Sequence, residues 1–414
     1  MVLFCSYHTT KYTMRKYEYF TGQPIFTQVL SAVNKRDINR IAKSEDSDRY
    51  YKKFKTYEHL VTMLYAIFQK CSSLREVTTG MQASMHKLHH LGMAYCPRRS
   101  TLSEANGKRD HQVFERIYMH LYESNKKCLP DSRRQKSWQD RLYIIDSTTI
   151  QLFSEILRGN GVSKIDGRTK GGLKVHTLIK ANEDVPCLVK LTESALHDVN
   201  FIDKLRLPEG SIVTFDKGYV NYKQYDLWES QNVKWVTRLK KKGLYEITSD
   251  RKISSKDIES GVQSDHNILL GGTSRTRQPR TKARMVKFYD KENDKQFNFT
   301  TNHKRLSARS IALIYKKRWQ IELLFKRVKQ NYPLRNFLGD NENAIKIQTW
   351  CALIADLLVK IVKSKTKRNW AFSGITSMIR IHLMSYIKLY TFLEHPDKFV
   401  INTIVVQPRP PTLF

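Results

Sequence analysis

The feature that most limits the fold is the order of short apolar runs after residue 142. Five runs have the length and composition of strands, at 142–146, 173–180, 186–191, 211–215 and 234–239. Helical segments at 198–205 and 221–230 separate the last three runs. Strands that alternate with helices indicate an α/β domain, and three strands in direct succession require a mixed sheet.

The rest of the chain reads differently on each side of this pattern. Residues 1–140 are expected to be helical, with helices at 57–69 and 103–122 and a polar linker at 131–141. Residues 241–305 contain short strand-like runs and are expected to form a β-rich insertion. After the insertion, long helices are expected at 307–330, 343–364 and 373–394.

These patterns predict three regions. Residues 1–140 form a helical domain, and residues 141–240 together with 306–414 form an α/β core with C-terminal helices. Residues 241–305 are inserted within that core. The role of residues 365–414 is left open between support of the core and pairing of two copies.

The balance of charged residues limits the partners. Lys and Arg number 72 against 39 Asp and Glu, which gives a formal net charge of +33. An excess of this size indicates a polyanionic partner, most often a nucleic acid. An apolar fraction of 40% argues against a disordered chain.

Two other classes of protein are not expected. The most apolar stretch, 350–362, is interrupted by Asp356 and Lys360 and is shorter than the ~20 residues of a membrane helix. The first residues lack the pattern of a secretory signal. Six scattered cysteines without a C-x-x-C pair favour reduced thiols and give no zinc motif.

Asp146 and Asp216 share a local context. Each is expected at the end of an apolar strand, before residues that favour a turn. Ligands of open α/β sheets collect at the carboxyl ends of strands, so the two carboxylates would meet if the first and fourth strands are neighbours. Each aspartate alone also fits a simple turn.

The helix expected at 307–330 supplies a third acid. At about 100° per residue, Tyr315, Arg318, Glu322 and Lys329 fall within an arc of ~60°, beside an apolar face. A solvated face with an Arg318–Glu322 ion pair is the simpler explanation. That explanation leaves Tyr315 and Lys329 without a role.

Three carboxylates would converge only around cations, because two like charges ~4 Å apart repel by about 4 kcal/mol at an effective dielectric constant of 20. Hard oxygen ligands suit Mg²⁺, for which Mn²⁺ could substitute. Two such ions can hold the attacking and leaving oxygens of a phosphodiester. We therefore expect Asp146, Asp216 and Glu322 to be catalytic and to bind two Mg²⁺. The side chains expected to grip DNA phosphates are Tyr315, Arg318 and Lys329.

These residues resemble a known family. The sequence is similar to bacterial insertion-sequence transposases of the DDE class, in the group marked by Y-x-x-R-x-x-x-E-x-x-x-x-x-x-K. The four residues of the helix stripe match every fixed position, and the segments at 143–148 and 215–219 match the group around its first two acids. The resemblance is strong over 142–335 and looser over 19–122, which looks like the helical N-terminal domain of some members.

The resemblance implies a ribonuclease-H-like mixed sheet, interrupted after its fifth strand by the β-rich insertion. It also implies a cut-and-paste transposase that cleaves at terminal inverted repeats and transfers 3′-hydroxyl ends into target DNA. A homodimer on DNA and a bacterial cytoplasmic, nucleoid-associated location follow from that activity. Family members cut through a hairpin with a flipped base stacked on tryptophan, and Trp228, Trp235 and Trp319 are the unassigned candidates here.

A basic stretch lies within the expected insertion. No acid occurs from Asn267 to Tyr289, and near-alternation would place several cations on one strand face. The residues expected to contact DNA there are Arg275, Arg277, Arg280, Lys282 and Arg284. A basic loop without such a role is the alternative.

Two other functions remain open. One is a nuclease on the same fold that cuts without strand transfer. The other is a basic DNA-binding protein, including a decayed transposase that binds and does not cut. The intact set of three acids argues against the second.

Overall fold

The computed structural model describes residues 22–129, 138–151, 163–165, 168–170, 172–193, 199–203, 205–271, 280–334 and 336–398. The N-terminal helices are α1 (Ile25–Val29), α2 (Lys35–Ser44), α3 (Thr56–Gln69), α4 (Leu74–Ala83), α5 (Arg99–Lys108) and α6 (Gln112–Asn125). The central elements are β1 (Leu142–Gln151), β2 (Ser163–Ile165), β3 (Arg168–Lys170), β4 (Gly172–Lys180), β5 (Pro186–Glu193), α7 (Val199–Ile202), β6 (Ile212–Phe215), α8 (Tyr222–Ser230) and β7 (Lys234–Arg238). The remaining elements are β8 (Tyr245–Asp250), α9 (Ser255–Glu259), β9 (Val262–Leu270), β10 (Thr281–Asp290), β11 (Lys295–Thr301), α10 (Ala308–Lys316), α11 (Trp319–Asn331), α12 (Glu342–Ser364), α13 (Phe372–Ile381) and α14 (Leu389–Glu394).

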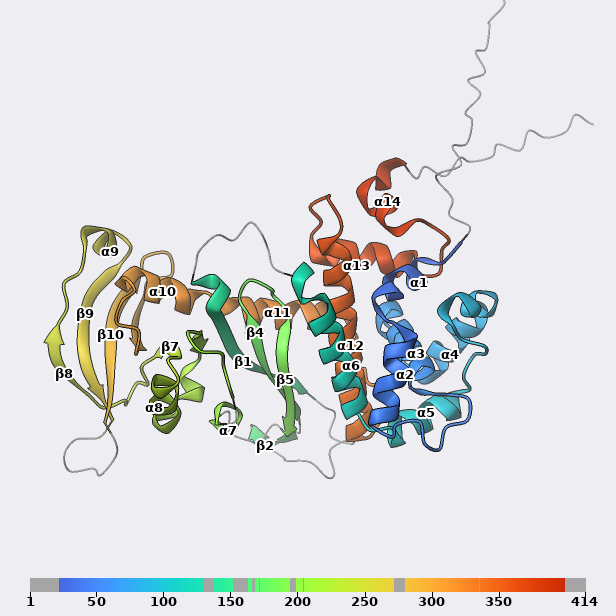
Figure 1. Cartoon of the computed structure of the whole chain (residues 1–414), viewed down its shortest axis with the longest axis horizontal. Helices are drawn as coiled ribbons and strands as arrows, with labels where there is room; N and C mark the ends of the chain where they lie inside the picture. Colours follow the sequence, from blue (N-terminus) through green and yellow to red (C-terminus); the bar gives the residue numbers. More distant parts are fainter. Residues whose placement is uncertain are drawn as a thin grey trace, which may run out of the picture.

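A nine-stranded sheet forms the middle of the molecule, in the order β5-β4-β1-β6-β7-β11-β10-β9-β8. β1, β6 and β7 run parallel, whereas the other neighbours pair antiparallel. The strands of 241–305 therefore continue the same sheet, because β11 pairs with β7. Figure 1 shows this extension at one end of the elongated molecule and the N-terminal helices at the other. The prediction of a mixed α/β fold with a helical N-terminal region is confirmed.

Both faces of the central strands are buried, as expected for strands that read as continuous apolar runs. Ile144 belongs to the core beneath α10, α11 and α12, whereas Ile145 belongs to the core on the opposite face, with Trp228 of α8. Successive side chains of a strand point to opposite faces. This alternation fixes the face on which every functional side chain of β1 and β6 emerges.

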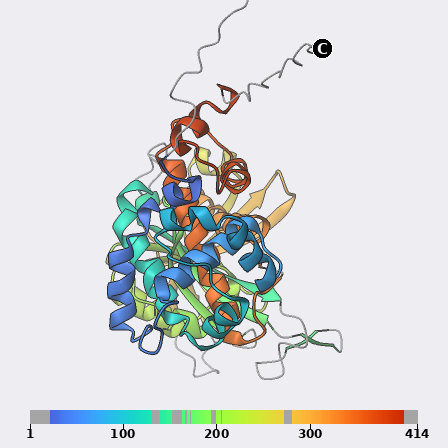
Figure 2. The ribbon, with the colours of Figure 1, turned by 90° about the vertical axis from the view of Figure 1, so that its right-hand side faces the viewer.

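The N-terminal helices and the sheet share one core through α12. This helix packs against α3, α5 and α6 and also against α11 and α13. Its residues from Ala344 to Val362 are almost all buried, as are those of α3 from Thr56 to Phe68. Figure 2 shows the N-terminal helices gathered around this long helix. Helix α11 is therefore held between the sheet and the helical region.

Two expected helices are each divided in the structure. The helix predicted at 103–122 is wrong as a single element, because α5 ends at Lys108 and α6 begins at Gln112. Between them, the carbonyl of Arg109 accepts from the Asn343 side chain at 2.6 Å. The helix predicted at 373–394 is divided into α13 and α14. Carbonyls of the intervening Leu383 and Ser385 accept from backbone N–H groups of the α1 segment instead.

The helix predicted at 307–330 is also two helices. Around Lys317 and Arg318 the backbone N–H groups donate to carbonyls three residues earlier, which tightens the turn between α10 and α11. The β-hairpin of β2 and β3 was not predicted. The linker predicted at 131–141 lies largely outside the described residues, with only 138–141 visible.

Among the helices that the structure describes, none has the combination of length and apolar character needed to cross a membrane. The described cysteines Cys71, Cys96, Cys128, Cys187 and Cys351 are free thiols.

Candidate active site

Asp146 and Asp216 lie side by side in the sheet. The parallel pairing of β1 and β6 ends with Ile145 opposite Phe215, so each aspartate is the next residue on its strand. Ile145 and Phe215 both belong to the core on the α8 face. Because side chains alternate, both aspartates point toward the face covered by α10 and α11.

The context predicted for Asp146 needs a correction. β1 does not end there but continues to Gln151, with Asp146 opposite Thr177 of β4. The antiparallel partner β4 supports the strand beyond the point where β6 stops. Asp146 therefore lies at the end of the parallel pairing, within a longer hairpin strand.

Asp216 is held by two residues from neighbouring elements. Nη2 of Arg238 donates to Oδ1 of Asp216 at 2.8 Å, and the Tyr315 hydroxyl donates to the same oxygen at 3.2 Å. No role was predicted for Arg238 from the sequence. The register of β6 and β7 could have identified this residue. Thr214 pairs with Val236, so the residues two positions later, Asp216 and Arg238, are expected to lie side by side.

Arg318 joins the first and third acids. Nη1 donates to Oδ2 of Asp146 at 2.6 Å, and Nη2 donates to Oε1 of Glu322 at 2.5 Å. The Arg318 side chain is 8% exposed, whereas that of Glu322 is 52% exposed. Glu322 lies in the first turn of α11, where the helix dipole favours an acid. The structure thus brings the three acids together around the two arginines, on one face of the sheet.

Burial controls the charge of this group. It raises the pKa of Asp146 to about 6, and the charges of Asp216 and Glu322 add to this effect against the opposing charge of Arg318. Burial also acts to raise the pKa of Asp216, but the hydrogen bond and charge of Arg238 outweigh it and the pKa is lowered. The arginines therefore compensate Asp216 more fully than Asp146.

Lys329 lies two turns further along α11. Its Nζ donates to Oγ1 of Thr148 at 2.7 Å and to the carbonyl of Thr149 at 3.1 Å. A cavity of about 930 Å³ is lined by Asp146, Thr148, Glu322 and Lys329, together with Lys70 and Lys326. The expected stripe of Tyr315, Arg318, Glu322 and Lys329 therefore does face the aspartates, although a turn divides its helix.

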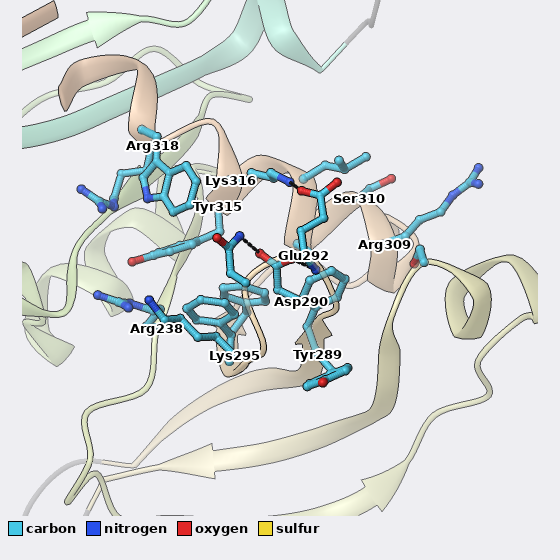
Figure 3. A pocket seen from close by; sticks show the side chains of 18 of the residues that line it. Arg238, Tyr289, Asp290, Glu292, Lys295, Arg309, Ser310, Tyr315, Lys316 and Arg318 are labelled. Carbon is cyan, nitrogen blue, oxygen red and sulfur yellow. Dashed lines mark hydrogen bonds and ion pairs between the residues drawn. The ribbon is translucent and has the colours of Figure 1, made fainter. Parts of the chain in front are cut away.

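A second cavity, of about 760 Å³, is lined in part by Tyr315, Arg318 and Arg238. Figure 3 shows Tyr315 between the side chains of Arg318 and Arg238, whose guanidinium carbons lie 5.8 and 5.5 Å from the ring centroid. Trp319 also lines this cavity and is 44% exposed. The other two tryptophan candidates, Trp228 and Trp235, are fully buried, which removes them from contact with any base.

The predicted basic surface is only partly supported. Lys282 is exposed, and Arg280 forms an exposed ion pair with Glu246 at 3.0 Å. The prediction that Arg284 contacts DNA is contradicted, because its guanidinium is buried against Asp265 at 2.6 Å. A buried cation of this kind needs its acid partner and has no surface to offer. Arg275 and Arg277 lie outside the described residues.

No group of three His, Cys, Asp or Glu side chains in the described ranges is arranged to hold a metal ion as it stands. Arg318 and Arg238 lie against the acids, as cations that balance their charge. The donors themselves are hard carboxylate oxygens, and burial raises the pKa of Asp146, so that a further cation would stabilise its ionised form. The chemistry of the donors therefore fits a hard divalent cation.

Residues 137–358, more than half of the chain, match the family described as a transposase DDE domain, and residues 21–94 match a domain of unknown function. A protein of Sinorhizobium fredii named as a transposase is 30% identical over 68% of this chain and 76% of its own length. A protein of Synechocystis named as an insertion-sequence transposase is 27% identical over 64% of this chain and 71% of its own.

A third relative, from Geobacillus stearothermophilus, is likewise named as an insertion-sequence transposase and is 27% identical over 65% of this chain and 68% of its own. Among solved structures, a piggyBac transposase synaptic complex with hairpin DNA has a TM-score of 0.41 at 11% identity, over 91% of this chain and 81% of that one. On the family match and the identity to its relatives, the chain belongs to the DDE-domain transposases of bacterial insertion sequences, enzymes that act on DNA.

Proposed function

We propose that this DNA transposase works by cut-and-paste, with Asp146, Asp216 and Glu322 as its catalytic residues. It would cleave at terminal inverted repeats and transfer the freed 3′-hydroxyl ends into target DNA. The observation that carries the proposal is the convergence of acids from β1, β6 and α11 on the pair Arg318 and Arg238.

The core would be ribonuclease-H-like. Supporting this, the strands β5, β4, β1, β6 and β7 follow one another in space as three antiparallel strands and then two parallel ones. β1 and β6, which are the first and fourth of these five strands along the chain, are direct neighbours in the sheet. The two aspartates need this arrangement to lie close together. The strands of 241–305 would then be an insertion that lengthens this sheet.

The family to which the chain belongs uses divalent metal ions. We propose two Mg²⁺, with Mn²⁺ as a substitute, held by Asp146, Asp216 and Glu322. When bound, such ions would polarise the phosphate and activate water or a 3′-hydroxyl for attack. The exposed Glu322 side chain is free to turn from Arg318 toward an ion. Asp146 is ionised above about pH 6, and below that pH an ion would have to displace its proton.

The cationic side chains would bind and orient the strand. Arg318 can present its planar guanidinium to a phosphate as a bidentate donor, and Lys329, tethered to Thr148, would act as a fixed point charge. Tyr315 keeps its proton, since burial raises its pKa to about 12, so it can donate to Asp216 or to a phosphate oxygen.

Other parts of the chain would hold the DNA at a distance from the acids. The helical residues before 140 would bind the terminal repeats, together with the exposed cations of the insertion, Arg280 and Lys282. Cleavage of two ends requires a homodimer on DNA. Work on chromosomal DNA would keep the protein at the bacterial nucleoid, in the cytoplasm.

The second cavity, which Tyr315 and Trp319 line in part, would accept an unpaired base. Trp319 is the exposed tryptophan that lines it, next to the phosphate-binding Arg318. A flipped base stacked there would be held by an aromatic face and by nearby cations, a contact worth about 1–3 kcal/mol. Replacement of Trp319 by Ala should then reduce the fluorescence change of 2-aminopurine at the terminal bases, while leaving salt-dependent binding of the duplex in place.

The experiment that tests the proposal is cleavage of a duplex taken from the DNA that flanks the reading frame. Asp146→Asn, Asp216→Asn and Glu322→Gln should each abolish Mg²⁺-dependent cutting while duplex binding persists. Near-normal cutting by any one of the three would remove that residue from the catalytic group. Asp203→Asn is a matched control, since this exposed carboxylate bonds Asn221 outside the group.

Strand transfer separates the proposal from a nuclease on the same fold. Pre-cut ends with a free 3′-hydroxyl should join to a target plasmid in the presence of Mg²⁺. Cutting without joining would favour the nuclease, and binding without cutting would favour a decayed transposase.

A further inference from the structure

Three lysines surround the cavity that contains Asp146 and Glu322. Lys326 and Lys329 belong to α11, whereas Lys70 directly follows α3 in the N-terminal helical part. All three are exposed, and none forms an ion pair with an acid in the described part of the chain. Both acids of the cavity accept from Arg318. The cavity therefore has an excess of positive charge.

The backbone of Lys70 is in an unfavourable conformation for its side chain. It caps α3 in the left-handed region, with φ of 57° and ψ of 38°. Glycine is common at this position and asparagine is tolerated, because a β-carbon crowds the backbone there. A lysine at this position needs a reason other than helix capping.

The position of Lys70 is fixed by rigid surroundings. Every residue of α3 from Thr56 to Phe68 is buried, so the helix end cannot shift easily. The Lys70 Nζ donates to the carbonyl of Gln330 at 3.2 Å, in the last turn of α11 and 260 positions along the chain. That bond uses one of its three donors and leaves the others available to a ligand.

The surroundings of Lys70 disfavour its positive charge. Burial, followed by the charge of Arg380, lowers its pKa. An anion in the cavity would stabilise the charged form of this lysine. A nucleic-acid strand carries a negative charge at every nucleotide, so a strand with one phosphate at Asp146 and Glu322 brings the adjoining phosphates to the cavity wall.

We propose that Lys70 is a substrate-positioning residue whose ammonium binds a DNA phosphate next to the bond that is cut at Asp146 and Glu322. The inference rests on the proposed function and adds to it that the N-terminal helical region completes the site. α3 and α11 would then grip the same strand, from Lys70 on one side and Lys329 on the other.

The test uses the full chain and the duplex that flanks the reading frame. Lys70→Asn removes the charge and suits the left-handed backbone, so the midpoint of thermal unfolding should not fall. Lys70→Arg keeps the charge. The control is Lys223→Gln, an exposed lysine in the first turn of α8. Helix α8 packs on the face of the sheet opposite to the acids, with Ile145 and Phe215.

In a series of duplexes, one phosphate at a time along the strand that is cut is replaced by a neutral methylphosphonate. In the unmodified chain and in Lys223→Gln, one replacement within a few nucleotides of the cut should lower binding and cutting about 5- to 30-fold. Lys70→Asn should lose a similar factor on native DNA and become insensitive at that same phosphate. Its slope of log affinity against log salt should fall by about 0.9, and Lys70→Arg should restore it.

The two proposals fail differently. If the unmodified chain cuts the duplex and Lys70→Asn matches it in slope and in phosphate sensitivity, the role of Lys70 is overturned while the proposed function stands. If the unmodified chain neither cuts the duplex nor joins its ends, the proposed function fails and the role of Lys70 falls with it.

Discussion

Nη1 of Arg318 lies 2.6 Å from Oδ2 of Asp146, although the two residues are 172 positions apart in the chain. This contact links α11 to β1 and places the first acid next to the third, because Nη2 of Arg318 also donates to Glu322. The ion pair of Arg318 with Glu322 is the one that a solvated helix face would form. The contact with Asp146 is what a solvated face would lack.

Arg318→Ala should have opposite effects on two ligands. Loss of the guanidinium leaves Asp146 and Glu322 less compensated, so Mn²⁺ without DNA should bind about tenfold more tightly. Binding of the terminal duplex should weaken, and its salt slope should fall by about 1, because a phosphate contact is lost. Calorimetry with Mn²⁺ and anisotropy with DNA measure the two. Arg368→Ala, which removes an exposed pair with Asp397, should change neither Mn²⁺ affinity nor cutting.

Lys329→Gln should weaken duplex binding and lower its salt slope by about 1. Thr148→Val removes the hydroxyl that Lys329 contacts at 2.7 Å and keeps the charge, so its slope should stay near that of the unmodified chain. Anisotropy at several salt concentrations checks both variants. A slope unchanged in Lys329→Gln would exclude this lysine from the phosphate contacts.

Arg327 anchors the face of α11 that is turned away from Glu322. It donates to Asp356 of α12 at 2.8 Å and to Asp184 after β4 at 2.7 Å, and its side chain is 14% exposed. Arg327→Met leaves the buried Asp356 carboxylate without its hydrogen-bonded partner, which should lower the free energy of unfolding by about 3–5 kcal/mol. Lys316→Met, which loses an exposed pair with Glu292, should cost less than about 1 kcal/mol. Denaturant titration distinguishes the two, and equal losses would contradict the anchoring role.

Acid should destabilise the N-terminal helices through His59. This side chain bonds Asn106 and Arg109, and burial followed by the charge of Arg109 lowers its pKa to about 3. The unfolded chain, with a histidine pKa of about 6.5, then binds one more proton between these values. Stability should therefore fall as the pH drops below about 6.5, by up to about 1.4 kcal/mol per pH unit.

Denaturant titrations at pH 7, 6 and 5 measure this dependence. His59→Gln should show a smaller slope, by the contribution of one proton, while His303 contributes in both proteins because its pKa is lowered to about 4, mainly by burial. An identical slope in the variant would exclude His59 as the group that titrates.

Local patterns predicted several elements well, and their failures have tertiary causes. The helix of α3 and the strands β4 to β7 were expected within a few residues, because their apolar patterns reflect their own burial. The helix expected at 103–122 is interrupted where Arg109 turns to Asp48, His59 and the carbonyl of Phe54. No periodicity within that segment contains these partners.

For the candidate site, too, local patterns predicted some residues, and contacts between distant segments decided the others. The spacing along the helix expected at 307–330 selected Tyr315, Arg318, Glu322 and Lys329, because the pitch of a helix fixes which residues share a face. The burial of Arg284 against Asp265 was not foreseen, because a run of basic residues does not reveal an acid on the adjacent strand β9. Lys70 was missed for a similar reason, since its partner Gln330 lies 260 positions away.

The sequence by itself determined the candidate residues for the chemistry: two aspartates that follow apolar strand residues and a helix stripe with an acid, two cations and a phenol. These are local properties, set by alternation in strands and by pitch in helices. Only the tertiary structure decided which cation meets which acid, how far the sheet extends, and that the N-terminal region reaches the cavity through Lys70. Those outcomes depend on strand register and on packing around α12, where segments distant in the chain exclude water together.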